Sequence, residues 1–194
     1  MAAYWTPLYL ATDNRNIEGG DYPIRKADMD HLEMIQLLLD KGANVNARIC
    51  GSQSTPGNCV GDSTETRTNF TMQWLYEDGA TAFLRAAQSG DVTLMKLLLA
   101  RGADPKIKTS YNVTALSVAA GIGWVEGVTF EWSPEQNLEA IRLCLDLGID
   151  VNAADDEGRR CWRCWDWLRA PAETRPFCSD DSGSPSVAES SHNA

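Results

Sequence analysis

Histidine is scarce in this chain, and the common catalytic signatures are absent. His31 and His192 are the only histidines among 194 residues. The sequence contains no G-x-S-x-G nucleophile motif, no phosphate-binding loop and no glycine-rich dinucleotide fingerprint. No Ser, His and acid set suggests nucleophilic catalysis. We therefore expect no cofactor and no metal site, and the sequence favours a binding protein over an enzyme.

Positive charge is also in short supply. The formal net charge is −10, and nine Asp or Glu lie between Gly121 and Glu157, where Arg142 is the single basic residue. Such a surface repels phosphate backbones, so we expect no nucleic-acid partner. The acidic residues are either simply solvated, which the composition favours, or they select a basic partner.

Long apolar runs are missing as well. No stretch approaches the length of about 20 residues that a membrane helix needs. The N-terminal segment "MAAYWTPLYLATDNRN" lacks both a basic start and a clean apolar signal region. We therefore expect no membrane partner and a cytoplasmic location by default, although the compartment is not determined. A monomer is the expected state.

The six cysteines are scattered and do not form a disulfide framework. Cys144 lies within a helical apolar pattern, so we expect it to be a small core residue. Cys50 and Cys59 flank a loop rich in Gly, Ser and Pro. Whether these two pair is left open by the sequence.

An internal repeat is the strongest signal that the sequence does contain. The segments that start at Thr81 and Thr114 begin alike and are offset by 33 residues, and an earlier copy begins at Thr6. Each copy starts with Thr and has an alanine-bearing first helix and a Leu-rich second helix. It ends with three residues in order: Gly, then Ala or Ile, then Asp or Asn. The helix pair is the repeating unit.

Each shared feature has a physical reason. A threonine side chain can accept a hydrogen bond from the first amides of a helix. Small residues let the neighbouring helix approach closely, namely Ala86, Ala87, Ala119 and Ala120. The second helices are predicted to face the core with Met34, Leu37 and Leu38, with Leu94, Leu97 and Leu98, and with Leu138, Ile141 and Leu145. Glycine reaches the left-handed conformation without strain, which predicts the helix ends at Gly42, Gly102 and Gly148.

This pattern resembles the ankyrin repeat family, because "TPL", the paired alanines, "LLLDKGANVN" and "GIDVNA" occur in order. The resemblance, to a bacterial type with loop insertions, implies an all-α solenoid of stacked helix-turn-helix units. The predicted ankyrin repeat domain covers residues 1–169, with copies at about 5–47, 78–108 and 111–153 and a degenerate fourth unit at 156–169. We expect residues 170–194 to be a disordered tail.

The first and third copies are longer than the second. From the capping Thr to the closing Gly the second copy takes 21 residues, whereas the others carry 15 and 13 more. Both extra segments, "RNIEGGDYPIRKAD" and "VEGVTFEWSPEQ", fall between the two helices, so we expect them to project from the same side of the stack. A third insertion, 48–77, is predicted to be either a solvated loop or a long binding finger.

The composition changes abruptly at the C-terminus. Three of the seven Trp and three of the six Cys lie between Cys161 and Cys178. A zinc site at the C-x-x-C pair lacks a convincing set of four ligands. Alternatively, GC-rich codons for "CWRCW" read in another frame encode Leu-Leu-Ala-Leu-Leu, so a truncated or frameshifted end is a second hypothesis.

The resemblance implies a protein–protein interaction module that binds its partner, of unknown identity, through hairpin tips, exposed first-helix positions and inserted loops. The expected contact residues are Arg85, Gln88, Ser89, Tyr111, Asn112, Trp124, Phe130 and Trp132. The aromatic members either bind a partner or cover the helical core. One alternative is a carbohydrate-type hydrolase that uses Glu126 and Glu131 in the Trp-rich insertion 124–136. Another is a truncated fragment with no independent function.

Overall fold

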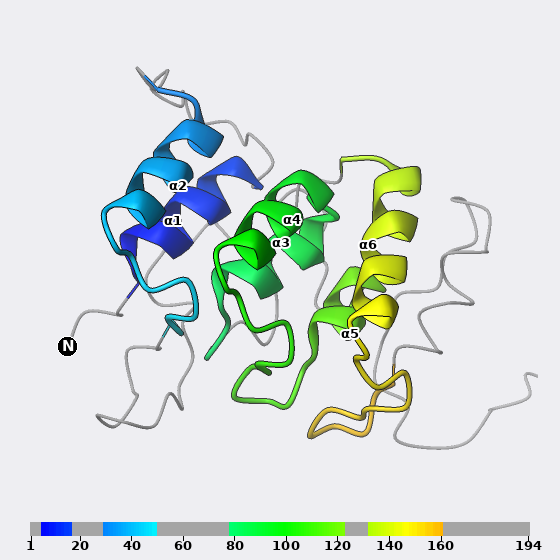
Figure 1. Cartoon of the computed structure of the whole chain (residues 1–194). Coiled ribbons are helices and arrows are strands. Elements are labelled where there is room, and N and C mark those ends of the chain that lie inside the picture. Colours follow the sequence, from blue (N-terminus) through cyan, green and yellow to red (C-terminus); the bar gives the residue numbers. More distant parts are fainter. Residues whose placement is uncertain (1–4, 17–28, 50–77, 123–131, 161–194) are drawn as a thin grey trace, which may run out of the picture.

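Three helical hairpins stand side by side in the computed structural model (Figure 1). The structure describes residues 5–16, 29–49, 78–122 and 132–160. The hairpins are α1 (Pro7–Arg15) with α2 (His31–Asp40), α3 (Ala82–Ser89) with α4 (Val92–Ala100), and α5 (Ala115–Ala119) with α6 (Pro134–Asp146). Within these ranges the chain forms no extended strand, only an isolated bridge between Ala154 and Arg160. The predicted all-α class is confirmed.

Threonine side chains start all three first helices. The Oγ1 atoms of Thr6, Thr81 and Thr114 accept hydrogen bonds from amides three residues further on, at 3.1, 3.3 and 3.1 Å. Such a cap stabilises a helix by about 1 kcal/mol, because it satisfies an amide that has no partner within the helix. The predicted capping role of these threonines is confirmed.

Glycines in the left-handed conformation follow the second helices. The φ angles of Gly42, Gly102 and Gly148 are 86°, 85° and 72°, as the sequence predicts. The amide of the next residue then donates back to a carbonyl of the last helical turn, as from Ala103 to Leu98 at 3.0 Å. This bond satisfies one of the exposed carbonyls at the helix end.

The middle hairpin forms the centre of the stack. Helix α3 packs against α1, α4 and α5, and α6 packs against α4 and α5. Every residue of α3 is buried, and Ala86 and Ala87 are completely covered. The small side chains thus allow the close helix approach that the sequence predicts.

The predicted core face of the second helices is only partly correct. Leu94, Leu98 and Ile141 are buried, and Leu38 and Leu97 are half-buried. Four other predicted core residues are exposed instead, Met34 at 39%, Leu37 at 41%, Leu138 at 39% and Leu145 at 43%. All four belong to the outer hairpins, which have a described neighbour on one side only. The buried second-helix positions that the prediction missed are Ile35, Leu39, Val92, Met95 and Ala140.

Candidate functional site

The connections between hairpins form a row of turns along the lower edge of the stack in Figure 1. Each turn is numbered by the predicted unit that follows it. The second, third and fourth turns each contain a left-handed residue, at Gly79, Asn112 and Gly158, with φ of 78°, 60° and 76°. Asparagine is one of the few residues other than glycine that adopts this conformation at low cost. The turns therefore share a left-handed residue although their sequences differ.

Hydrogen bonds join each turn to the next. The amide of Ser110 donates to the carbonyl of Asp78 at 2.7 Å, and the amide of Asp156 donates to the carbonyl of Tyr111 at 3.1 Å. The side chain of Asn112 donates to Asp156 Oδ1 at 2.6 Å. The row of turns is thus a connected surface whose residues hold fixed relative positions.

Two predicted contact residues lie on this edge. Asn112 is exposed on the third turn, and its neighbour Tyr111 is half-buried and packs against the core. Their roles in partner binding stay a prediction.

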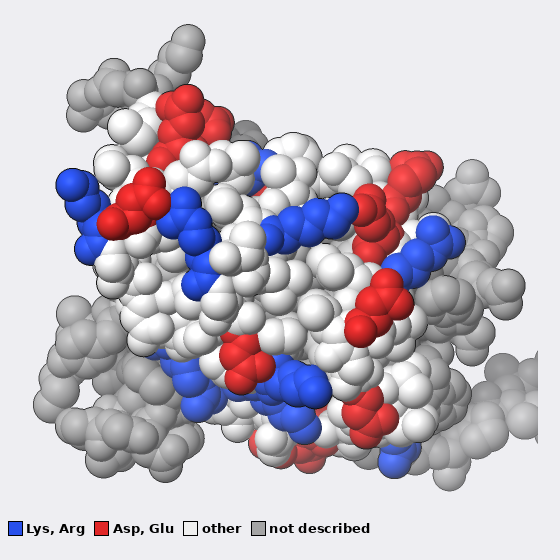
Figure 2. Space-filling view, viewed as in Figure 1, with Lys and Arg blue, Asp and Glu red and all other residues white. Residues whose placement is uncertain are grey.

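Three basic side chains gather on the same edge, and sequence reasoning missed them as a group. Arg48, Lys106 and Lys108 are all exposed. Arg48 donates from Nε to the carbonyl of Gly79 at 2.8 Å and from Nη2 to the carbonyl of Lys108 at 3.2 Å. Among the described residues, none of the three forms an ion pair with a carboxylate. Figure 2 shows Lys and Arg side chains grouped low on this face of the molecule. We call these three residues the basic tip cluster.

A signal for the basic tip cluster is present in the sequence. Arg48 stands six residues after Gly42, and Lys108 stands six residues after Gly102. The two therefore occupy the same position of consecutive copies. Aligning the copies for charge, in addition to apolar pattern, would have found them.

The first-helix residues predicted to be exposed are buried. Arg85, Gln88 and Ser89 are 1%, 4% and 1% exposed, so the expectation of an accessible surface at these positions is wrong. The reason is a polar network between α1 and α3. The Arg85 guanidinium donates to Asp13 Oδ1 at 2.8 Å and to the carbonyl of Asn16 at 2.5 Å.

The rest of this network lies on α3 itself. Nη1 of Arg85 donates to Gln88 Oε1 and to Ser89 Oγ, both at 2.6 Å. A buried guanidinium needs such partners, because loss of its hydration is costly unless its donors are satisfied. The three side chains therefore join the first two hairpins.

Trp132 extends the connection to the third hairpin. Its indole Nε1 donates to Asn16 Oδ1 at 2.9 Å, and the Arg15 guanidinium lies 4.6 Å from the centre of its ring. Arg15 also forms an ion pair with Asp91 at 2.7 Å. Residues of all three hairpin units thus meet at one place, which we call the three-copy junction.

The three-copy junction marks the positions of two insertions. Asn16 directly precedes 17–28, and Trp132 directly follows 123–131. These flanking residues are hydrogen-bonded to each other, so the two insertions leave or rejoin the stack at the same side. Trp132, a predicted contact residue, is half-buried here and takes part in packing between copies.

Several predicted residues lie outside the described part of the chain. They are Trp124, Phe130, Glu126, Glu131, Cys50, Cys59, the fourth unit from residue 161 and the tail 170–194. The aromatic recognition site and the hydrolase alternative therefore stay predictions.

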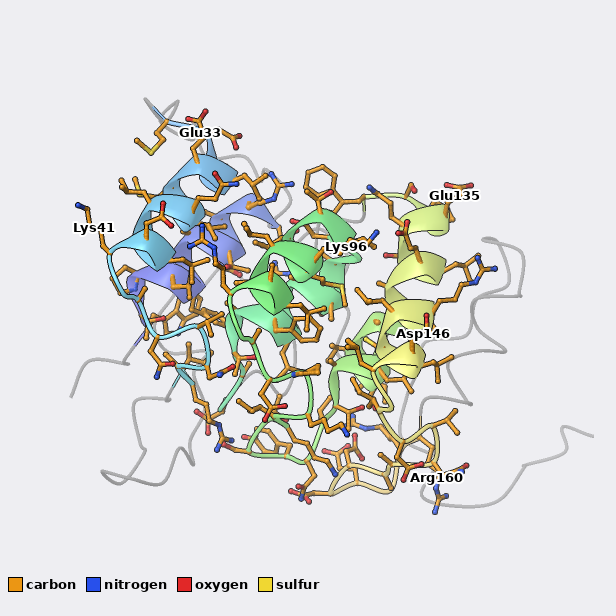
Figure 3. The ribbon with its side chains drawn as sticks, in the orientation of Figure 1. Glu33, Lys41, Lys96, Glu135, Asp146 and Arg160 are labelled. Carbon is orange, nitrogen blue, oxygen red and sulfur yellow. The ribbon has the colours of Figure 1, made fainter. Side chains whose placement is uncertain are left out.

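The second helices carry exposed ion pairs between hairpins. Lys96 on α4 lies 2.7 Å from Glu139 on α6, and Arg101 lies 2.6 Å from Asp40 on α2. Figure 3 shows Lys96 on the side of α4 towards α6, and Arg160 at the lower edge beside the turns. Pairs of this kind stabilise little, but they neutralise charge on this side of the stack.

The described ranges also bear on metal binding and membrane spanning. Within them, no group of three or more His, Cys, Asp or Glu side chains could hold a metal ion. No helix of that part is long and apolar enough to cross a bilayer. Cys144 is fully buried, as predicted, and burial raises the pKa of its thiol to about 12.

The row of helix pairs joined by hydrogen-bonded turns defines a helical-repeat protein. The family model for the ankyrin repeat matches residues 4–49 and 78–110, which cover the first two copies. A curated ankyrin repeat protein of fowlpox virus (strain NVSL) is 26% identical over 131 residues, 68% of this chain. The chain spans only 15% of the length of that relative. Residues 4–49 and 78–110 are thus ankyrin repeats.

Proposed function

We propose that this chain is a non-catalytic protein-binding module that contacts its partner through the row of turns. Ankyrin repeats in general mediate protein–protein interactions, which supports binding as the function but names no surface or partner. In the described part of the chain, the first helix α3 offers no accessible side chain. The turns offer exposed side chains on a backbone that hydrogen bonds hold in place.

The proposal for the chemistry of the partner is based on the basic tip cluster. Arg48, Lys106 and Lys108 present positive charge in a chain whose net charge is −10. Charge complementarity across an interface guides association and selects partners. An acidic, extended segment of another protein fits this edge best, because it can follow the row of turns and pair with successive basic side chains.

Arg48 shows how such a segment would be received. Two carbonyls, those of Gly79 and Lys108, hold its guanidinium across two neighbouring connections. The charge is therefore positioned before any partner arrives. A pre-positioned arginine loses less rotamer entropy on binding than a free side chain does.

The test is a titration of the full chain with a fluorescein-labelled peptide of alternating glutamate and leucine, followed by anisotropy. The double variant Lys106→Glu with Lys108→Glu is expected to weaken binding by roughly tenfold or more, since about 1.4 kcal/mol corresponds to tenfold. Raising the salt concentration should weaken binding of the unaltered chain in the same direction.

The matched control makes the same change in net charge on another surface of the molecule. Lys41 and Arg142 are exposed on the second-helix side and form no ion pair with a described carboxylate. The double variant Lys41→Glu with Arg142→Glu should bind the peptide nearly as well as the unaltered chain does. Equal weakening by both variants would show a non-specific charge effect and would contradict the proposed surface.

A further inference from the structure

A fourth turn ends the described part of the chain, and its side-chain caps match those of the third turn. In the third turn, Thr109 Oγ1 accepts from the amides of residues 111 and 113 at 3.3 and 3.1 Å. In the fourth turn, Asp155 Oδ1 accepts from the amides of residues 157 and 159 at 3.0 and 2.9 Å. Different residues therefore build the same cap at the same spacing.

The backbone bonds of the two turns match as well. The amide of Thr109 donates to the carbonyl of Val113 at 3.0 Å, and the amide of Asp155 donates to the carbonyl of Arg159 at 3.1 Å. Each turn is also bonded to the turn before it through the amide of the residue that follows its cap. The fourth turn is therefore a complete repeat turn, not an irregular end.

The register of this turn points to a following helix. Thr81 and Thr114, which start α3 and α5, each stand two residues after the left-handed residue of their turn. Arg160 stands two residues after Gly158, whose φ is 76°. The chain thus leaves the fourth turn where a first helix begins, although arginine lacks the acceptor with which threonine caps a helix.

The end of the stack next to this turn exposes three apolar side chains. Leu138, Leu145 and Val151 are 39%, 43% and 44% exposed. The residues of α4 that correspond to the two leucines are Val92, which is 4% exposed, and Leu99, which is half-buried against the core. Helix α4 has α6 beside it, and in Figure 1 α6 is the last described helix of the row. Terminal repeats of a solenoid normally need a polar outer face, whereas this end exposes three apolar side chains beside Arg142.

The sequence that follows has the length and pattern to cover this end. After Arg160 come 34 residues, whereas the second copy takes 21 from its capping Thr to its closing Gly. Cys161, Cys164, Trp165 and Leu168 recur at the spacing of one apolar helix face. We propose that the segment beginning at Cys161 packs as a fourth unit against the α5–α6 end of the stack.

The test uses cysteine cross-linking in the full chain. A Leu145→Cys variant, treated with a short bis-maleimide, is expected to cross-link to Cys161, Cys164 or Cys178 within one molecule. Peptide mass spectrometry identifies the linked pair. The matched control is Leu37→Cys, which is similarly exposed at the opposite end of the stack and should give roughly tenfold fewer such links, since the segment would be held away from it.

Two outcomes would overturn the proposal. Equal yields from both variants would mean that the segment does not favour this end. Links found only between two chains, detected in a mixture of isotope-labelled and unlabelled protein, would mean that a second copy covers the face. A Val151→Cys variant repeats the test from another position of the same end, and circular dichroism checks that each variant keeps its helices.

Discussion

Arg85 shows most clearly that the type of a residue does not determine its place in the fold. Its guanidinium is almost entirely covered and spans α1 and α3 through Asp13 and the carbonyl of Asn16. An arginine in a helix is usually solvated, so its residue type alone predicts exposure. The acceptors that bury it come from residues about 70 positions earlier, as with Asp13, which is 72 residues away. Local sequence reasoning cannot find such a partner.

Replacing Arg85 tests its structural role. Arg85→Met is expected to lower the free energy of unfolding by roughly 3 kcal/mol or more, because it removes the ionic partner of the buried Asp13 carboxylate. Urea unfolding followed by circular dichroism measures the change. The control Arg142→Met, on an exposed side chain, should stay within about 0.5 kcal/mol of the unaltered chain. Equal effects of the two substitutions would refute a structural role for Arg85.

Cys144 gives a prediction about pH. Burial raises its pKa from 9.0 to about 12, so the folded thiol stays protonated where the unfolded thiol ionises. Below pH 9 the thiol is protonated in both states, and its contribution to stability is fully present. Between pH 9 and about 12 that contribution is lost as pH rises. The unfolding free energy of the unaltered chain should therefore fall more steeply over this range than that of Cys144→Ala.

Labelling provides an independent check on the same thiol. N-ethylmaleimide should modify Cys144 only after denaturant is added, because the thiolate is the reactive form and the side chain is covered. Peptide mass spectrometry separates it from the other five cysteines. Rapid labelling of Cys144 in the native chain would contradict its burial.

At the scale of helices and turns, the sequence predicts well the features that depend on local residues. It does not predict the features that depend on which helices pack beside one another. The caps at Thr6, Thr81 and Thr114 and the glycine ends depend on residues within a few positions, so the sequence contains the whole cause. The exposure of Leu138 and Leu145 depends on whether another helix packs beside α6. The local sequence pattern does not predict such a neighbour. The basic tip cluster is partly predictable. The sequence shows that Arg48 and Lys108 share a repeat position, but only the fold brings them close together.

The cap of α3 is the clearest target at this scale. Thr81→Val keeps the shape of the side chain and removes the oxygen that accepts from the amide of Leu84. We expect a loss of about 1 kcal/mol in unfolding free energy. Thr81→Ser retains the acceptor and should lose less. If the valine and serine variants are equally stable in urea, the capping bond does not contribute as described.

For the whole molecule, the three-copy junction changes how the stack should unfold. In a simple solenoid each repeat contacts only its neighbours, so stability is a sum of adjacent terms. Here Trp132, which precedes α6, contacts Arg15 and Asn16 at the C-terminal end of α1. The first and third copies are therefore linked directly, and we expect them to open together.

Removing Trp132 tests this link. Trp132→Ala should speed hydrogen exchange of the amides in α1, because the first hairpin loses a contact worth about 1–2 kcal/mol, which corresponds to roughly a five- to thirtyfold change. Trp132→Phe keeps the aromatic ring near Arg15 but loses the indole donor, so its effect should be smaller. Amides in α4 serve as the internal reference. Unchanged exchange in α1 would show that the copies are coupled only through neighbours.

The most direct test of the proposed function is to map where an acidic peptide binds. Hydrogen exchange of the full chain should be compared with and without the glutamate and leucine peptide. We predict slower exchange at residues 48–49 and 106–110, which form the basic tip cluster and its connections, and little change in α2, α4 and α6. Protection confined to those three helices, with the turns unaffected, would contradict the account.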